Sequence, residues 1–321
     1  MKKFIGIFSG ALCLLVVIFS PFLIKKAQAS NENKSIILTV WHIDGFEGGK
    51  GSRYTFLREM ALNFSKKNKG VYILVSNYTQ SGANELISKG KTPDVISYGG
   101  VGIDLQNYAQ ELSVEGFEGG VINGKCYAVS YLKGGYFAIK KGDGSSEIII
   151  SKGENVTPEI ACLFSSERAS VYTVKPPLDA YALFLTKKNA TLIGTQRDIE
   201  RLISRGEEFS AQPINGYSDI YQYLSLTSQK AQNEYYARKF ISHLTSKSVQ
   251  EKVTSLKMLS VNQTGLYPDN EYLSALEKTE VNYTFSPFSD RITHKKACDT
   301  ALSLLKSSGN YNEIINFIKQ L

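Results

Sequence analysis

Residues 36–52 read IILTVWHIDGFEGGKGS, a short apolar run followed by a stretch rich in glycine. Such a run is typical of a buried strand, and the glycines after it indicate a turn. From Arg53 the apolar residues recur at helical spacing, and lysines precede Gly70, as they commonly do where a helix ends. We therefore predict a strand, a turn and a helix over residues 36–69.

The same alternation of strand and helix continues along the chain. A second strand is predicted at residues 71–75, a short helix at 84–89 and a third strand at 93–98. Alternating elements call for a mostly parallel sheet with helices on its faces, so the fold class is α/β. No internal repeat is present, so two lobes would have to interleave. Later elements follow from local patterns: strands at 127–131 and 136–139, and helices at 178–185, 199–203, 237–244, 297–305 and 314–321.

The composition is that of a globular protein, and it excludes several classes. With 321 residues, 42% of them hydrophobic, the chain is long enough for two domains of about 150 residues and is neither collagenous nor disordered. The formal net charge is +7, but four lysines lie in the first 29 residues, which leaves +3 for the remainder. So small an excess gives no reason to expect a nucleic-acid partner.

The N-terminus has the pattern of an export signal. Two lysines precede an apolar run over residues 4–24, and the small-x-small sequence AQA at 27–29 fits a cleavage site. We predict a signal peptide over residues 1–29; an uncleaved membrane anchor is the alternative, because the run is nearly long enough to span a bilayer. No second apolar run of about 18 residues follows. We therefore expect an exported protein, extracellular or attached to the cell surface, and periplasmic where the source has an outer membrane.

Neither a metal site nor a cofactor is predicted. Three cysteines follow the signal peptide: Cys126, Cys162 and Cys298. Their spacing fits no zinc pattern, and their odd number allows at most one internal disulfide. The chain has three histidines, too few for a metal site of several imidazoles: His42, His243 and His294.

The glycine-rich turn invites comparison with a phosphate-binding loop, but it does not fit one. That motif needs four residues between its glycines and a Ser or Thr directly after the lysine. Here three residues separate Gly45 from Gly49, and another glycine follows Lys50. What remains is a helix N-terminus with Ser52 as predicted N-cap, where free backbone N–H groups favour an anionic or polyhydroxyl ligand. A simple turn is the alternative.

The sequence shows no complete catalytic motif. It lacks Gly-x-Ser-x-Gly and His-Glu-x-x-His, and three copies of Ser-x-x-Lys have no companion motif. Of the histidines, His42 alone follows a predicted strand, at the sheet edge where open α/β sheets bind ligands, so a catalytic triad that includes it stays open. Asp44 and Glu47 share the next loop, but spacing alone does not identify a glycosidase pair.

In their order along the chain, several segments resemble the bacterial extracellular solute-binding proteins of the sugar-type ABC importers, solute-binding protein family 1. They are residues 37–42, 64–68, 71–75 and 90–96 near the start, and 189–198, 237–245 and 248–251 later on. The resemblance extends from Ile36 to about Val261. Two features depart from the family. After cleavage 321 − 29 = 292 residues remain, which is short for the family, and the missing length falls around residues 140–176. The cysteine that usually carries a lipid anchor is also missing.

The resemblance implies a periplasmic-binding-protein-like fold of type II, in which two α/β lobes close around a solute by hinge motion. It assigns residues 30–130 and 226–280 to lobe 1, and residues 131–225 and 281–321 to lobe 2. Aromatic rings suit the apolar faces of sugars, and planar Asp, Glu, Gln and Arg groups suit their hydroxyls. Carried over residue by residue, the ligand-binding candidates are Trp41, His42, Asp44, Glu47, Arg53, Ser97, Tyr98, Tyr136, Gln196, Arg197, Tyr217 and Tyr221.

Two arginines are the sharpest of these candidates. Arg53 stands beside the glycine-rich turn and Arg197 in a segment similar to the one that precedes a ligand-contacting turn in the family. A planar charged group at such a place either meets a solute or pairs with an acid of the protein itself, such as Asp44 or Asp198.

The sequence therefore predicts an exported, non-enzymatic receptor, a monomer that delivers a carbohydrate or another polar solute to the permease subunits of an ABC importer. Residues 41–53 and 196–221 would face each other across a water-filled cleft, with the only tryptophan among them. One alternative is an extracytoplasmic glycan hydrolase. Another is an oxyanion or phosphate receptor, favoured if the amides of residues 48–52 and Arg53 converge on one pocket. A third is a degenerate receptor that signals without transport.

Overall fold

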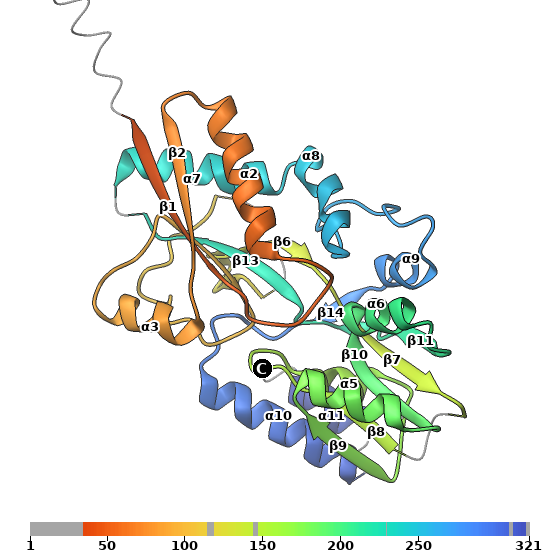
Figure 1. Cartoon of the computed structure of the whole chain (residues 1–321). Helices are drawn as coiled ribbons and strands as arrows, with labels where there is room; N and C mark the ends of the chain where they lie inside the picture. Colours follow the sequence, from red (N-terminus) through yellow and green to blue (C-terminus); the bar gives the residue numbers. More distant parts are fainter. Residues whose placement is uncertain (1–34, 114–118, 144–146, 229, 308–310, 319–321) are drawn as a thin grey trace, which may run out of the picture.

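The computed structural model describes residues 35–321 except 114–118, 144–146, 229, 308–310 and 319–321. The predicted signal peptide, residues 1–29, lies outside this part of the chain. Within the described part, no helix is long and apolar enough to cross a membrane. Two α/β lobes make up the fold, and each is built on a five-stranded sheet (Figure 1).

The sheet of lobe 1 has three parallel strands at one side. Its strands, in spatial order, are β2 (Val71–Asn77), β1 (Ile36–Ile43), β3 (Val95–Gly99), β13 (Tyr221–Leu226) and β6 (Val129–Lys133). The first three run parallel, whereas β13 runs antiparallel to both of its neighbours. Helices α2 (Arg53–Lys67) and α7 (Ala231–Leu244) pack against this sheet and against each other, and α3 (Gln80–Ser88) connects β2 to β3 (Figure 1). A small hairpin of β4 (Val121–Ile122) and β5 (Lys125–Cys126) precedes β6.

The strand, turn and helix predicted at the start of lobe 1 are confirmed, and burial explains them. Along β1 the side chains of Leu38 and Val40 are fully buried, whereas Ile37 is 53% exposed on the other face. Ser52 caps α2 by accepting a hydrogen bond from the backbone N–H of Thr55, which satisfies one of the donors that a helix start leaves free. The helix therefore begins directly after the glycine-rich loop and holds that loop at the carboxyl end of β1.

Lobe 2 has its own five-stranded sheet. In spatial order the strands are β11 (Ser210–Pro213), β7 (Tyr136–Lys141), β10 (Ala190–Thr195), β8 (Glu147–Ser151) and β9 (Val171–Lys175). Strands β10, β8 and β9 run parallel, and β7 runs antiparallel to β10 and β11. The helices of this lobe are α4 (Pro158–Phe164), α5 (Pro177–Thr186), α6 (Gln196–Arg205), α9 (Glu271–Glu277), α10 (Arg291–Lys306) and α11 (Tyr311–Ile318).

Within the described residues the chain passes between the lobes three times, so the lobes interleave. It runs from β6 to β7 through Gly134 and Gly135, and from β12 (Gly216–Tyr217) to β13 through residues 218–220. These two crossings lie side by side, since the N–H of Gly134 donates to the carbonyl of Ile220 at 2.8 Å. The third crossing follows α8 (Lys247–Gln250) and the 3-10 helix η1 (Glu251–Leu256) and leads to α9, after which β14 (Val281–Tyr283) pairs with β12.

Two segments lie elsewhere than the predicted lobe boundaries put them. The prediction gives residues 131–225 to lobe 2, but β6 ends at Lys133 and β13 begins at Tyr221, and both strands belong to the lobe 1 sheet. Helix α9, predicted in lobe 1, packs against α6 and β11 of lobe 2. The six residues of β13 are all buried, so they show no alternation of exposed and buried positions that would have revealed the strand.

Candidate ligand-binding cleft

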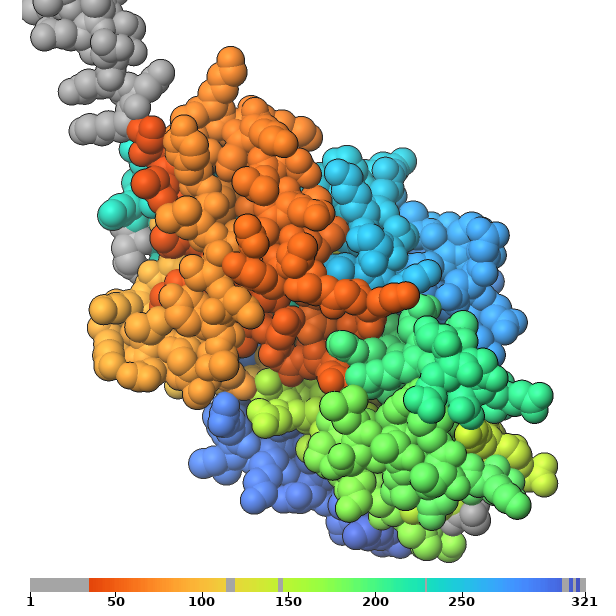
Figure 2. All heavy atoms as spheres, in the orientation of Figure 1, coloured from red at the N-terminus to blue at the C-terminus, as the bar shows by residue number. Residues whose placement is uncertain are grey.

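Both lobes line one cleft, of about 660 Å³, where the parallel strands of the two sheets end. Lobe 1 contributes Arg53 and the loop after β1, Asp44–Glu47. Lobe 2 contributes the loop after β8 (residues 152–155), the turn after β9 (residues 176–177) and Arg197 at the start of α6. Ligands of open α/β sheets bind at such carboxyl ends. Figure 2 shows the orange segment of lobe 1 directly against the green segments of lobe 2 on one face of the molecule.

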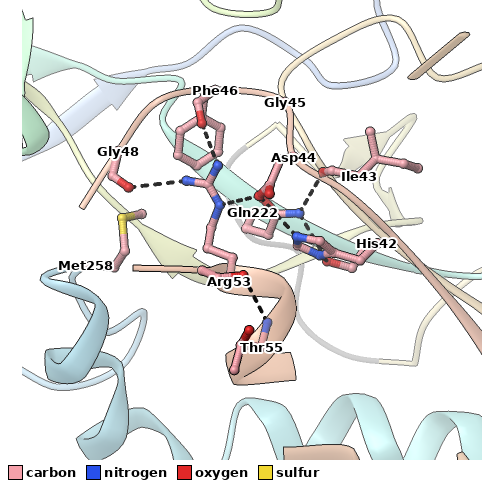
Figure 3. A network of polar contacts seen from close by, with 12 residues as sticks. His42, Ile43, Asp44, Gly45, Phe46, Gly48, Arg53, Thr55, Gln222 and Met258 are labelled. Atoms are coloured by element: carbon pink, nitrogen blue, oxygen red, sulfur yellow. Dashed lines mark hydrogen bonds and ion pairs between the residues drawn. The ribbon is translucent and has the colours of Figure 1, made fainter. Parts of the chain in front are cut away.

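Arg53 organises the loop on the lobe 1 side (Figure 3). Its Nε donates to Oδ1 of Asp44 at 2.9 Å, while Nη1 and Nη2 donate to the carbonyls of Gly48 and Phe46. The guanidinium also lies 4.1 Å from the centroid of the Phe46 ring. The side chain is only 6% exposed, so Arg53 pairs with an acid of the protein, the internal arrangement that the sequence left open, and fixes what the loop presents to the cleft.

Asp44 presents a charged carboxylate at the mouth of this network. Partial burial raises its pKa, but the hydrogen bond of His42 and the charge of Arg53 together outweigh burial and hold the pKa well below its usual value. The side chain is 48% exposed. Asp44 is therefore an ionised hydrogen-bond acceptor that faces the cleft in a fixed orientation.

Behind Asp44 runs a buried chain of hydrogen bonds with the residue types of a catalytic triad. His42 Nε2 lies 3.1 Å from Asp44 Oδ1, and His42 Nδ1 lies 3.0 Å from Ser97 Oγ. However, His42 and Ser97 are both fully buried, and Ser97 Oγ is also within hydrogen-bond distance of Tyr131 and Gln222. A substrate has no access to this serine, so the chain holds Asp44 in place instead of activating a nucleophile.

Glu47, in the loop after β1 of lobe 1, contacts the start of α6 in lobe 2. Its Oε2 accepts from Arg201 at 3.0 Å and lies 3.9 Å from Arg197 Nε, and its backbone carbonyl accepts from the Thr195 hydroxyl at 3.1 Å. The Asn155 side chain donates to the Gly45 carbonyl at 3.0 Å. The loop after β1 is therefore bonded directly to lobe 2.

The start of α6 is itself locked by a capping box. Asp198 accepts from the backbone N–H of Thr195, and the Thr195 hydroxyl accepts from the N–H of Arg197. Burial raises the pKa of Asp198, and its ion pair with Arg201 opposes that rise. Arg197 lies 3.9 Å from Glu47, a long distance for an ion pair, and its side chain is 35% exposed. Its guanidinium therefore remains accessible from the cleft.

Lys152 is a cleft residue that the sequence analysis did not single out. Its Nζ lies 2.7 Å from the carboxylate of Glu159, a buried residue of α4. Burial lowers the pKa of Lys152, but the charges and hydrogen bonds of Glu159 and Cys298 together outweigh burial and raise the pKa, so the lysine stays charged. Asn155 and Phe46 were missed as well. The loop that contains Lys152, Gly153 and Asn155 lies between a strand and a helix, as Gly45–Ser52 do. This position in the chain is the signal from which these cleft residues could have been predicted.

The predicted site residues fall into two groups. Asp44, Glu47, Arg53 and Arg197 line the cleft together. The remaining eight do not line it and are buried within the lobes or at the crossings: Trp41, His42, Ser97, Tyr98, Tyr136, Gln196, Tyr217 and Tyr221. Trp41 packs on Tyr78, with 4.8 Å between ring centroids, and Tyr136 donates to Asp219 at 2.6 Å. Phe46 is the one aromatic side chain among the described residues that line the cleft.

The sequence analysis favours an oxyanion receptor only if the amides of residues 48–52 and Arg53 converge on one pocket. The structure does not show that convergence. The N–H of Lys50 donates to the carbonyl of Leu256 at 2.6 Å, and Arg53 points at backbone carbonyls of its own loop. The amides of residues 48–52 and the guanidinium of Arg53 therefore do not converge on one pocket.

Comparison with models of known protein families finds no match, and comparison with curated protein sequences finds none either. Solved structures do match. The chain is similar to the sugar-binding protein MalE of Xanthomonas citri, with a TM-score of 0.60, 10% identity, and 88% of this chain and 95% of that one covered. It is also similar to MalE of Bdellovibrio bacteriovorus bound to maltotriose (TM-score 0.55, 14% identity, 89% and 99% covered). A third is the GacH receptor of Streptomyces glaucescens, solved unliganded and with acarbose (TM-score 0.56, 12% identity, 89% and 97% covered).

These likenesses define the class of protein to which the fold corresponds. The chain has the same two-lobed α/β fold as these proteins, which confirms the predicted fold class. Strands β8 and β9 and helix α4 lie in the region where we expected the chain to be shorter than the family, and the loops after β8 and β9 line the cleft.

Proposed function

We propose that the protein is an exported solute receptor that binds a carbohydrate between its lobes and delivers it to the permease of an ABC importer. The observation that carries this proposal is the cleft itself, which both lobes line at the carboxyl ends of their strands. Similar structures contain maltotriose or acarbose in proteins of the same fold. We further propose that the receptor is a monomer without enzymatic activity.

The groups at the cleft suit a polyhydroxyl ligand. Asp44 accepts hydrogen bonds, Arg197 donates them, and Glu154, in the lobe 2 loop that lines the cleft, is exposed. Sugar hydroxyls both donate and accept, so they match this mixture of charged and planar groups. With Phe46 largely covered by Arg53, stacking contributes less here than hydrogen bonding.

Binding would act through closure of the lobes. A ligand that contacts Asp44 on lobe 1 and Arg197 on lobe 2 binds the closed form more tightly than any open form, so it shifts the population toward closure. The direct contacts between Glu47 and α6 add to the same closed arrangement.

Titration with maltotriose, acarbose and a panel of other oligosaccharides tests the proposal. Isothermal calorimetry should find saturable binding to at least one of them, and the same ligand should stabilise the fold by about 2.7 kcal/mol at a hundredfold excess over Kd. Arg197→Ala should weaken that binding without lowering the melting temperature. Turnover of a glycan substrate, with no saturable binding in the panel, would refute the receptor function.

A further inference from the structure

The edge of the lobe 1 sheet that β2 forms is open. Strand β2 pairs with β1 in an unbroken parallel register and has no other strand beside it within the described part of the chain. Its sequence, VYILVSN, contains no charged residue and no proline. Native proteins usually protect an edge strand with a charge, a proline, a bulge or a covering segment, because a free edge can pair with another chain.

The other three edge strands of the two five-stranded sheets each have such protection. Strand β9 ends in Lys175, and β11 ends in Pro213. Along β6, the N–H of Lys133 donates to the carbonyl of Leu259 at 3.1 Å, so a neighbouring segment covers part of that edge. Among the described residues of these sheets, β2 is therefore the edge strand that is left unprotected.

The register with β1 shows which backbone groups of β2 face outward. At one end of the pairing the N–H of Ile36 donates to the carbonyl of Gly70, and at the other end the N–H of Tyr78 donates to the carbonyl of His42. Backbone groups alternate in direction along a strand. The even-numbered residues of β2 therefore bond to β1, and the odd-numbered residues direct their N–H and C=O groups away from it.

Ile73 and Val75 thus present their backbone groups at the open edge. The Val75 carbonyl accepts from the hydroxyl of Tyr54 at 3.3 Å, on helix α2, which packs along β2 (Figure 1). The Ile73 carbonyl and the N–H groups of both residues have no protein partner in the described part of the chain. An added strand would pair with these three groups, as a peptide does when it extends a sheet.

Apolar side chains border the open edge on the face of the sheet opposite α2. Tyr72 is 56% exposed and Leu74 is 57% exposed, and Ile37 of β1, which lies opposite Tyr72 in the register, is 53% exposed. A strand added beside β2 would place alternate side chains next to Tyr72 and Leu74 and remove part of this apolar surface from water. Side chains as well as backbone groups would therefore stabilise the pairing.

The charge beside the edge indicates the kind of partner. Arg58 of α2 is exposed, with its guanidinium 5.6 Å from the centroid of the Tyr54 ring, and Lys69 is exposed in the turn before β2. Neither residue makes an ion pair within the described residues. An acidic residue of an added strand would meet an unpaired positive charge there. A second copy of the chain fits less well, because antiparallel pairing of two β2 strands would bring the two Arg58 residues together.

We propose that the open edge of β2 binds an extended peptide segment of a partner protein, which adds to the lobe 1 sheet as a further strand and carries an acidic residue that pairs with Arg58. The main chain of the segment bonds to Ile73 and Val75, and its apolar side chains pack on Tyr72 and Leu74. This goes beyond the proposed receptor function, because none of these residues lines the cleft.

A fluorescein-labelled peptide of sequence EEVTVTVTEE tests the proposal. Fluorescence anisotropy with the full chain should show saturable binding, and the same peptide with proline in place of two valines should not bind, because proline has no N–H to donate. In the complex, the N–H groups of Ile73 and Val75 should exchange with deuterium roughly tenfold more slowly than in the free chain. Those of Tyr72 and Leu74, already bonded to β1, should change little.

Matched variants locate the bound peptide. Leu74→Glu should weaken binding roughly tenfold, because it removes an apolar contact and repels the acidic peptide. Leu178→Glu changes a similarly exposed leucine on α5 of lobe 2 and should leave binding unchanged. Arg58→Glu should weaken the binding of EEVTVTVTEE and strengthen that of KKVTVTVTKK, since it reverses the charge beside the edge. Melting curves check that each variant is folded.

Three results would overturn the proposal. The first is a lack of saturable binding of EEVTVTVTEE, and the second is binding that leaves the N–H groups of Ile73 and Val75 unprotected from exchange. The third is protection of these groups in the free chain that rises with protein concentration, which would make a second copy the occupant of the edge.

Discussion

Arg201 of α6 in lobe 2 donates a hydrogen bond to Glu47 of lobe 1, with 3.0 Å between Nη2 and Oε2. Glu47 stands in the loop after β1, and its backbone carbonyl also accepts from Thr195. These contacts exist only when the lobes approach each other. Part of the free energy that favours closure therefore comes from the protein itself, and under the proposed function a ligand would add to it through contacts with both lobes.

Glu47→Gln should loosen the closed arrangement. The ion pair is partly exposed, so its loss costs about 1 kcal/mol or less, which shifts the balance of closed and open forms roughly fivefold. Small-angle X-ray scattering should show a larger radius of gyration for the variant. Added salt should expand the wild type in the same direction, because salt screens an exposed ion pair.

A matched control lies within lobe 2. Lys141 and Glu207 form an ion pair at 2.8 Å that does not bridge the lobes, so Glu207→Gln removes a similar contact and should leave the radius of gyration unchanged. Equal expansion of both variants, or of neither, would show that Glu47 does not hold the lobes together.

Asp44 should make the free energy of unfolding depend on pH. Burial raises its folded pKa, but His42 and Arg53 outweigh burial and lower it, whereas the unfolded pKa is about 3.9. Its stabilisation is therefore complete above about pH 5 and is lost as the pH falls below 4. In urea unfolding Asp44→Asn should lose about 1 kcal/mol at pH 7, allowing for solvent screening, and the difference should shrink toward pH 2. A constant difference over that range would contradict the ionised state.

The first part of the fold was predictable because local signals agree there. In β1 and α2 the apolar spacing, the Ser52 cap and the glycine-rich turn all indicate the same elements. Strand β13 gave no such signal, because Gln222 and Ser225 are buried polar residues whose partners come from distant parts of the chain. Its place between β3 and β6 depends on contacts that no local window contains.

Half of the cleft was predictable for a similar reason. Asp44, Glu47 and Arg53 follow a recognisable strand, so their place at the sheet edge could be inferred. Lys152 and Asn155 follow β8, which the sequence analysis did not predict. The tyrosines were wrongly predicted as ligand-binding residues. The hydroxyls of Tyr98 and Tyr136 form hydrogen bonds with the buried residues Ser225 and Asp219, and their rings do not line the cleft.

His294 should make the protein sensitive to mild acid. Burial and the charges of Lys152 and Arg291 lower its pKa to about 4, from an unfolded value of 6.5. The unfolded chain then binds the proton more readily, so stability falls as the pH drops from about 6.5 to 4, by about 2 kcal/mol. His294→Leu should flatten the unfolding free energy over this range, and NMR should place the His294 titration near pH 4. A titration near 6.5 would rule the mechanism out.

Trp41 fluorescence should respond little to a ligand in the cleft. The ring is 9% exposed and packs on Tyr78 within lobe 1, so acrylamide should quench it weakly and a bound sugar should not touch it. Pro177→Trp, made together with Trp41→Phe, places a reporter at the cleft and should change its emission on titration. A large change in the wild type with none in this variant would mean that the ligand binds elsewhere.

Gly134→Ala should disturb the crossing between β6 and β7. A Cβ at this position would stand 2.2 Å from Gln196 Nε2 and 2.7 Å from Ile220 Cγ2, closer than real contacts allow. We expect a loss of about 1–3 kcal/mol in denaturant unfolding, the usual cost of overpacking a buried site. Gln196→Ala removes the nearer obstacle, so the double variant should lose less than the sum of the two single losses. Strict additivity would mean that the crossing relaxes away from Gln196, so that the loss in Gly134→Ala does not come from a clash with that side chain.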